Sequence, residues 1–149
     1  NEFKDIKIIV KLHPGQNDHN QNLMEIFKQI DPSIPIFQIK PSKEIVHQCD
    51  LLLNITCESF DASTIMLEGL ILEKPVLEIL LDDNKYEISN DAIISISYKD
   101  DLKKYIQNIL FNQEFEKINI ENQKKVLKNY LSYQSKSSDK ILKLINEWK

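Results

Sequence analysis

Short apolar runs that alternate with helical stretches constrain the fold of this chain more than any other feature of its sequence. Five runs, rich in isoleucine, valine and leucine, have the length of strands and end at turn residues or polar loops. They span residues 6–12, 34–39, 50–55, 76–81 and 93–97. Strands separated by helices at such short intervals pair in parallel through right-handed crossovers. The sequence therefore predicts an α/β fold with an open, doubly wound, Rossmann-like and mostly parallel sheet of about five strands.

The first run, 6–12, is rich in β-branched residues and ends at His13-Pro14-Gly15. A nearly continuous apolar run is typical of a strand that is covered on both faces, so we expect a central parallel strand here. The second run contains Pro35, which a strand tolerates only at its start or at an edge.

Helices are expected between these strands. The clearest has apolar residues at positions i, i+3, i+4 and i+7, namely Leu23, Ile26, Phe27 and Ile30. It should end before Pro32, because the residue that precedes a proline is disfavoured in helical conformation. Shorter helices are expected at 44–48 and 63–73.

The tail from residue 99 onward is predicted to be wholly helical. Its first helix should be capped by Asp100 or Asp101, and the third by Ser137 or Ser138. The apolar faces of the second and third helices are formed by Val126, Leu127, Tyr130 and Leu131, and by Ile141, Leu144, Ile145 and Trp148. With 149 residues, the chain has the size of one domain. We expect one Rossmann-like domain over 1–149, with an α/β core at 1–98 and C-terminal helices at 99–149.

Composition excludes several classes of function. Acidic and basic residues are interleaved and the net charge is −4, which disfavours a nucleic-acid partner because binding to a duplex needs a clustered basic face. No apolar run approaches the roughly 20 residues that span a bilayer. Cys49 and Cys57 lack CxxC spacing, which favours a reducing compartment, and together with His47 they are too few and too irregular to predict a metal site.

All 19 basic residues are lysines, so no guanidinium is available to clamp an anion. Helix termini, hydroxyls, histidine or lysine must then hold any anion. Ligands of open parallel sheets lie beyond the carboxyl ends of the strands. Two loops occupy such positions: Lys11-Leu12-His13-Pro14, and the segment 56–64.

The second of these loops leads into the helix expected at 63–73. Its N-terminus offers unpaired N–H groups and a partial positive charge, which the hydroxyls of Ser63 and Thr64 would complete as a phosphate site. Glu68 lies on the same side of the helix, about 6 Å beyond Thr64 along the axis. A carboxylate there suits a neighbouring ribose, because it accepts hydrogen bonds from two adjacent hydroxyls.

Each of these features also has a purely structural interpretation. Ser63 and Thr64 have the residue types of an ordinary helix cap. Glu68 is also compatible with a position in solvent or an ion pair with Lys74. His13-Pro14-Gly15 is also compatible with a simple turn that ends a strand.

The motifs KLHP at 11–14 and ST-x-x-x-E-x-x-x-x-x-KP at 63–75 resemble those of a known family. They are similar to the C-terminal, nucleotide-binding half of GT-B glycosyltransferases, above all the enzymes of capsular and surface polysaccharide synthesis and the related non-hydrolysing UDP-N-acetylglucosamine 2-epimerases. The resemblance implies that Ser63 and Thr64 bind the donor diphosphate, with Ser59 as a competing hydroxyl. It also implies that Glu68 binds the ribose, and that His13 faces the phosphates and stabilises the leaving group.

The resemblance further implies that this chain is one half of a two-domain protein. The N-terminal domain would supply the acceptor pocket and usually the catalytic base, so this fragment alone should be inactive. The ligand would be a nucleoside diphosphate sugar, with no metal or other cofactor. The full-length protein would be cytoplasmic, associated peripherally with the inner face of the membrane.

Two other functions stay open. An epimerase of the UDP-N-acetylglucosamine type would use the same ligand but needs acid and base residues acting on the sugar. A non-enzymatic flavodoxin-like or receiver-like module would use the same fold. A receiver, however, has an acidic pair after its first strand and an aspartate at the end of a central strand, where this chain has His13 and Thr56.

Overall fold

The computed structural model describes residues 6–56, 63–81, 93–130, 143 and 145–147. The chain divides into two compact units, Asn1–Gln48 and Cys49–Lys149. The fold is α/β with parallel strands, as predicted, and its five described strands form one sheet of two strands and one of three. No helix within the described ranges is long and apolar enough to cross a membrane. The extent of a single domain over 1–149 stays a prediction.

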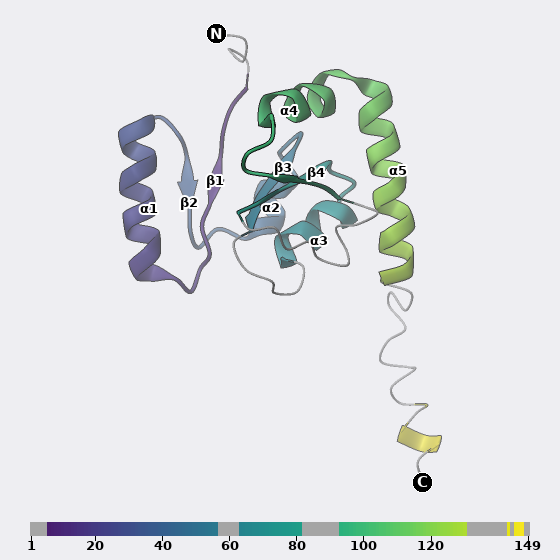
Figure 1. The fold of residues 1–149 in the computed structure, drawn as a ribbon. Coiled ribbons are helices and arrows are strands. Elements are labelled where there is room, and N and C mark those ends of the chain that lie inside the picture. The colour runs from purple at the N-terminus through teal and green to yellow at the C-terminus, as the bar shows by residue number, and fades with distance from the viewer. Residues whose placement is uncertain (1–5, 57–62, 82–92, 131–142, 144, 148–149) are drawn as a thin grey trace. The chain divides into compact units, whose positions relative to one another are not determined.

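The first unit is a strand-helix-strand motif followed by a short helix (Figure 1). Its elements are β1 (Val10–Lys11), α1 (Asn17–Ile30), β2 (Ile36–Phe37) and α2 (Ser42–Val46). β1 and β2 pair in parallel, with Val10 opposite Ile36 and Lys11 opposite Phe37. Backbone hydrogen bonds from the N–H of Val10 to Pro35 and from that of Leu12 to Phe37, 2.9 and 2.8 Å long, flank this ladder.

The prediction of a central strand at 6–12, covered on both faces, was wrong in length and in burial. Among the described residues β1 pairs only with β2, and Ile8 and Ile9 are 57% and 40% exposed. The partner strand limits the ladder, because β2 is only two residues long and Pro35, which precedes it, has no N–H to donate.

Helix α1 ends at Ile30, before Pro32 as predicted, but it begins at Asn17, well before its apolar pattern starts. Residues 17–22 are polar, so hydrophobic periodicity could not locate the first turn. Leu23, Ile26 and Ile30 remain exposed, and the one buried residue of α1 is Asn20. The structure thus buries a polar residue that the apolar pattern does not identify.

Over its described residues, the second unit contains the three-stranded sheet, the helices α3, α4 and α5, and further helical residues at 143 and 145–147 (Figure 1). Its elements are β3 (Leu52–Thr56), α3 (Thr64–Ile71), β4 (Val76–Leu80), β5 (Ile94–Ser97), α4 (Leu102–Phe111) and α5 (Gln113–Tyr130). The strand order is β3-β4-β5, and both pairings are parallel. β4 is the central strand and is buried along its whole length, as is typical of a central parallel strand that is covered on both faces.

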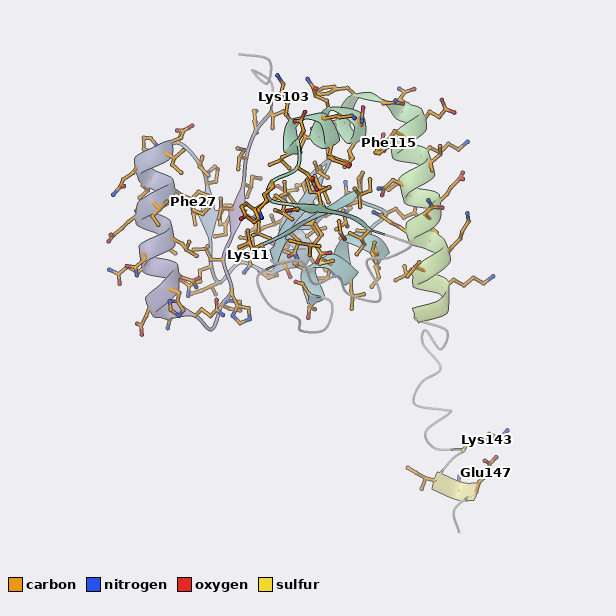
Figure 2. All side chains as sticks on the ribbon, viewed as in Figure 1. Lys11, Phe27, Lys103, Phe115, Lys143 and Glu147 are labelled. Atoms are coloured by element: carbon orange, nitrogen blue, oxygen red, sulfur yellow. The ribbon has the colours of Figure 1, made fainter. Side chains whose placement is uncertain are left out.

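One apolar cluster of this unit lies where the sheet meets α4 and the start of α5. Leu77, Ile79 and Ile96 of the sheet pack with Ile109 of α4. Partly buried side chains that pack around them include Tyr105 and Phe115; the latter is labelled in Figure 2. This packing covers one face of β4 and β5.

The start of α4 settles the choice between Asp100 and Asp101 as its cap. Asp101 caps α4, because its carboxylate accepts a hydrogen bond from the N–H of Lys104 at 3.2 Å. Asp100 instead accepts from the N–H of Ser97 at 2.8 Å. Lys143 and residues 145–147 are helical. The remaining predicted tail residues, Leu131, Ser137, Ser138, Ile141, Leu144 and Trp148, lie outside the described residues.

Candidate functional site

The N-terminus of α3 follows the carboxyl end of β3, as the sequence predicts. Ser63 is the N-cap residue, and its carbonyl accepts hydrogen bonds from the N–H groups of Met66 and Leu67 at 2.9 and 3.3 Å. Its side chain makes no capping hydrogen bond, so the hydroxyl does not serve as an ordinary cap. The first N–H groups of a helix have no partner within the helix. Thr64, the first helical residue, is exposed.

Glu68 lies one turn further along α3, and its side chain is only partly exposed. Its Oε2 atom is buried and has no hydrogen-bond partner among the described residues. Within the described chain Glu68 forms no ion pair with Lys74, and the ion pairs found there join Lys124 to Glu73 and Lys143 to Glu147. Neither structural interpretation of Glu68, a solvent position or a pair with Lys74, describes this oxygen.

An unpaired carboxylate oxygen is unfavourable in this position. Burial without a hydrogen bond costs roughly 1–3 kcal/mol for a polar group, and more for a charged one. Native proteins keep few such atoms, and each requires an explanation, such as strain, a catalytic role or a bound water or ion. A ligand hydroxyl that donates to Oε2 would remove this cost, and a ribose carries two such hydroxyls side by side.

The other end of α3 is fixed by a Schellman motif. The N–H of Glu73 bonds to the carbonyl of Leu70 at 3.2 Å, and that of Lys74 to the carbonyl of Gly69 at 2.9 Å. Glu73 has φ of 53°, the left-handed conformation that this motif requires. Pro75 follows and prevents further helix, so the helix that carries Glu68 has a sharp end.

Helix α5 holds the segment that joins α3 to β4. Gln123 is fully buried, and in the amide orientation that satisfies both of its polar atoms it donates to the Lys74 carbonyl and accepts from the N–H of Val76, each at 3.0 Å. The Asn119 amide lies 2.6 Å from that of Gln123. An ion pair of 2.8 Å between Lys124 and Glu73 adds an exposed contact. These contacts fix the connection through which the chain passes from α3 into β4.

His13 belongs to the first unit, directly after β1, and its side chain is exposed. The N–H of Gly15 donates to His13 Nδ1 at 3.1 Å, and the buried Asn20 of α1 donates through Nδ2 to the His13 carbonyl at 2.5 Å. Pro14 and Gly15 form a turn after β1, and a side chain from α1 holds the backbone of this turn.

Lys11 has a structural role in this unit (Figure 2). Its ammonium donates to the carbonyls of Leu12 and Gln38 at 2.6 and 2.8 Å. Gln38 in turn donates to the Pro14 carbonyl at 3.3 Å and to Oδ1 of Asn17 at 2.6 Å. The positive charge of Lys11 thus lies against backbone carbonyls at the end of the β1–β2 sheet.

The structure brings Ser63, Thr64 and Glu68 together on the first turns of one helix. His13 is in the other unit, Asn1–Gln48. Ser59 lies outside the described residues.

Four polar residues of the interior were not identified from the sequence: Asn20, Glu78, Asn119 and Gln123. Glu78 is fully buried on β4 and accepts a hydrogen bond from Ser95 Oγ at 2.7 Å. Asn54 on β3 and Ser95 on β5 lie opposite Glu78 in the two ladders. The signal for Glu78 was its charge within the apolar strand VLEIL, since a buried carboxylate requires partners.

Cys49 is a free cysteine that is partly buried. Burial raises the pKa of its thiol, and the positive charge of Lys74 opposes this increase only in part. Cys57 lies outside the described residues. Over the described part of the chain, no group of three or more histidine, cysteine, aspartate or glutamate side chains is placed to hold a metal ion.

No protein-family model, no curated protein and no solved structure matches this chain. The function must therefore be inferred from the chemistry of α3 and of the His13 segment.

Proposed function

We propose that this chain is the donor-binding domain of a GT-B glycosyltransferase that uses a nucleotide-activated sugar in surface polysaccharide or glycoconjugate synthesis. The observation that carries the proposal is the buried and unpaired Oε2 of Glu68 on α3. It is supported by the similarity of the motifs around His13, Ser63 and Glu68 to those of that family.

The diphosphate of the donor would bind at the N-terminus of α3. Backbone N–H groups, the helix dipole and the hydroxyls of Ser63 and Thr64 supply hydrogen bonds and partial positive charge at one point. The Ser63 hydroxyl makes no capping hydrogen bond, so it is free of that task. The ribose would lie further along the helix, where Glu68 accepts hydrogen bonds from its hydroxyls.

The chemical role of this half is to stabilise the leaving group. Negative charge grows on the nucleoside diphosphate as its bond to the sugar breaks, and fixed dipoles aimed at that charge lower the barrier. The N-terminus of α3 would supply such dipoles, and the family resemblance assigns a phosphate contact to His13, with no metal required. The acceptor pocket and the catalytic base would come from an N-terminal domain, so this chain alone would bind the donor without transferring the sugar. The complete protein would act in the cytoplasm, at the inner face of the membrane.

Calorimetric titration of the 149-residue chain with UDP, CDP, GDP and their sugar conjugates tests this proposal. We expect weak binding of at least one of them, and a loss of about tenfold in affinity for Glu68→Ala, which corresponds to about 1.4 kcal/mol and the loss of charged hydrogen bonds. Glu121→Ala is the matched control, because Glu121 is an exposed glutamate on α5 and its removal should leave affinity unchanged. The proposal fails if none of these ligands binds, or if Glu68→Ala binds the best of them as tightly as the wild type.

A further inference from the structure

We propose that Asn20 is a positioning residue that acts through His13, and that it presents the imidazole to the ligand as a donor of one hydrogen bond from Nε2. The inference rests on the proposed function for the identity of the ligand, a phosphoryl oxygen of a nucleoside diphosphate. Its structural part, the fixed state of His13, can be tested without any ligand.

The state of the imidazole follows from its contact with Gly15. A backbone N–H can only donate, so the Gly15 N–H at 3.1 Å requires Nδ1 to be an acceptor. In a neutral imidazole the other nitrogen then carries the proton. Within the described residues no hydrogen bond from Nε2 is found, and the side chain is exposed. His13 therefore offers an N–H donor to solvent or to a bound anion.

The backbone that carries this imidazole is held from two sides. Asn20 is 1% exposed and its Nδ2 donates to the His13 carbonyl at 2.5 Å. Gln38 donates to the carbonyl of the next residue, Pro14, at 3.3 Å. A buried amide that bonds a loop carbonyl is costly to leave unpaired, so the Asn20 contact fixes the conformation in which Gly15 can reach Nδ1.

The hydrogen bond from Asn20 to the His13 carbonyl explains the burial of Asn20 better than helix stability does. The apolar residues of this helix, Leu23, Ile26 and Ile30, are exposed in the first unit, whereas Asn20 is buried at the point where α1 meets the His13 segment. Helix interiors disfavour asparagine by up to about 0.7 kcal/mol relative to alanine. A buried asparagine is therefore better explained by the hydrogen bond that it donates than by helix stability.

Long-range ¹H–¹⁵N NMR correlation of the full 149-residue chain, at about pH 9 where exposed imidazoles are neutral, tests the structural part. We expect His13 to show a single tautomer, with a pyridine-type shift at Nδ1 and a pyrrole-type shift at Nε2. His19 and His47, both exposed, serve as internal references and should show averaged shifts. Asn20→Asp keeps the shape of the side chain but removes its donor, and should move the His13 shifts toward those references.

Two further variants separate positioning from loss of fold. Gln38→Ala releases the Pro14 carbonyl without altering a fully buried residue, and should also move the His13 shifts, by less than Asn20→Asp. Asn22→Ala removes an exposed asparagine from the same helix and should leave them unchanged. If Asn20→Asp unfolds the first unit, the result for Gln38→Ala decides. Averaged His13 shifts in the wild type, or unchanged shifts in a folded Asn20→Asp or Gln38→Ala variant, overturn the inference.

UDP titration tests the functional part. His13→Ala and Asn20→Asp should each weaken UDP binding by about fivefold to tenfold, the effect of one lost hydrogen bond. The double variant should bind no more weakly than His13→Ala, because residues that act through one contact are not additive. Additive losses would overturn the assignment of Asn20. Absence of UDP binding by the wild type would count against the proposed function, while the NMR result would still decide the state of His13.

Discussion

At the scale of single residues, Glu68 carries most of the functional argument. Its position on α3 could be predicted from its spacing after Thr64, because helical geometry fixes the offset of residues four apart. Its buried and unpaired oxygen could not be predicted, since burial depends on how α3 packs against the rest of the unit. Asn20 was not identified for the same reason: its burial is set by tertiary packing and leaves no periodic signal in a polar stretch.

Glu68 should reduce the stability of the free protein. Glu68→Gln keeps the size of the side chain but removes the charge, so the uncompensated burial of a carboxylate oxygen is relieved. We expect the free energy of unfolding, measured in urea without ligand, to rise by about 1 kcal/mol. Glu121→Gln on the exposed face of α5 should change it by less than about 0.5 kcal/mol. A marked loss of stability in Glu68→Gln would show that the folded chain itself supplies a partner for the charge.

Cys49 should react slowly with alkylating reagents. Burial raises the pKa of its thiol, so the folded chain holds the proton more tightly than the unfolded chain does. The corresponding stability is present below the pKa of the unfolded thiol and is lost as pH rises through that of the folded one. In a Cys57→Ser variant, iodoacetamide should modify Cys49 more slowly in the folded than in the urea-unfolded chain between about pH 7 and about pH 9. Equal rates would contradict this.

At the scale of elements, the sequence predicted whether a segment is a strand or a helix better than it predicted the length of that strand or helix. The strands β3, β4 and β5 lie within one or two residues of their predicted bounds, because short runs rich in isoleucine, leucine and valine between polar segments define them. The run at 6–12 forms only the two-residue β1, because the length of a strand also depends on its partner and Pro35 limits β2. Helix α5 begins at Gln113, long before the apolar face at its end.

The two glycines of the chain should respond differently to substitution by alanine. A Cβ on Gly69 would lie 2.8 Å from Leu52 Cδ2 and 2.9 Å from Val76 Cγ2, so Gly69→Ala would push α3 away from β3 and β4. We expect a loss of about 1–3 kcal/mol in the free energy of unfolding, measured by urea denaturation, as is usual for overpacked interiors.

Gly15→Ala is the matched control for this change. Its Cβ would make ordinary contacts of 3.5 and 3.6 Å with the His13 ring, and Gly15 does not have positive φ. Alanine should therefore be neutral or stabilise by up to about 1 kcal/mol through the unfolded state. Equal effects of the two substitutions would show that α3 does not need a small residue where it crosses the sheet.

At the scale of the whole molecule, the α/β class with parallel strands was predictable from the alternation of strands and helices. The division into Asn1–Gln48 and Cys49–Lys149 was not predicted, because nothing in composition marks a linker at that point. The candidate site was likewise predictable in part. Ser63, Thr64 and Glu68 lie on the first turns of α3, as the motif predicts. The hydrogen bond from Asn20 to the His13 carbonyl, in the other unit, was not predicted.

The most direct test of the central claim compares UDP with 2′,3′-dideoxy-UDP by calorimetry, in the wild-type chain and in Glu68→Ala. If Glu68 binds the ribose, the wild type should lose about tenfold in affinity when the hydroxyls are removed, while Glu68→Ala should bind both ligands with nearly the same low affinity. Equal sensitivity of both proteins to the missing hydroxyls would contradict the assignment of Glu68 and, with it, the proposed donor site.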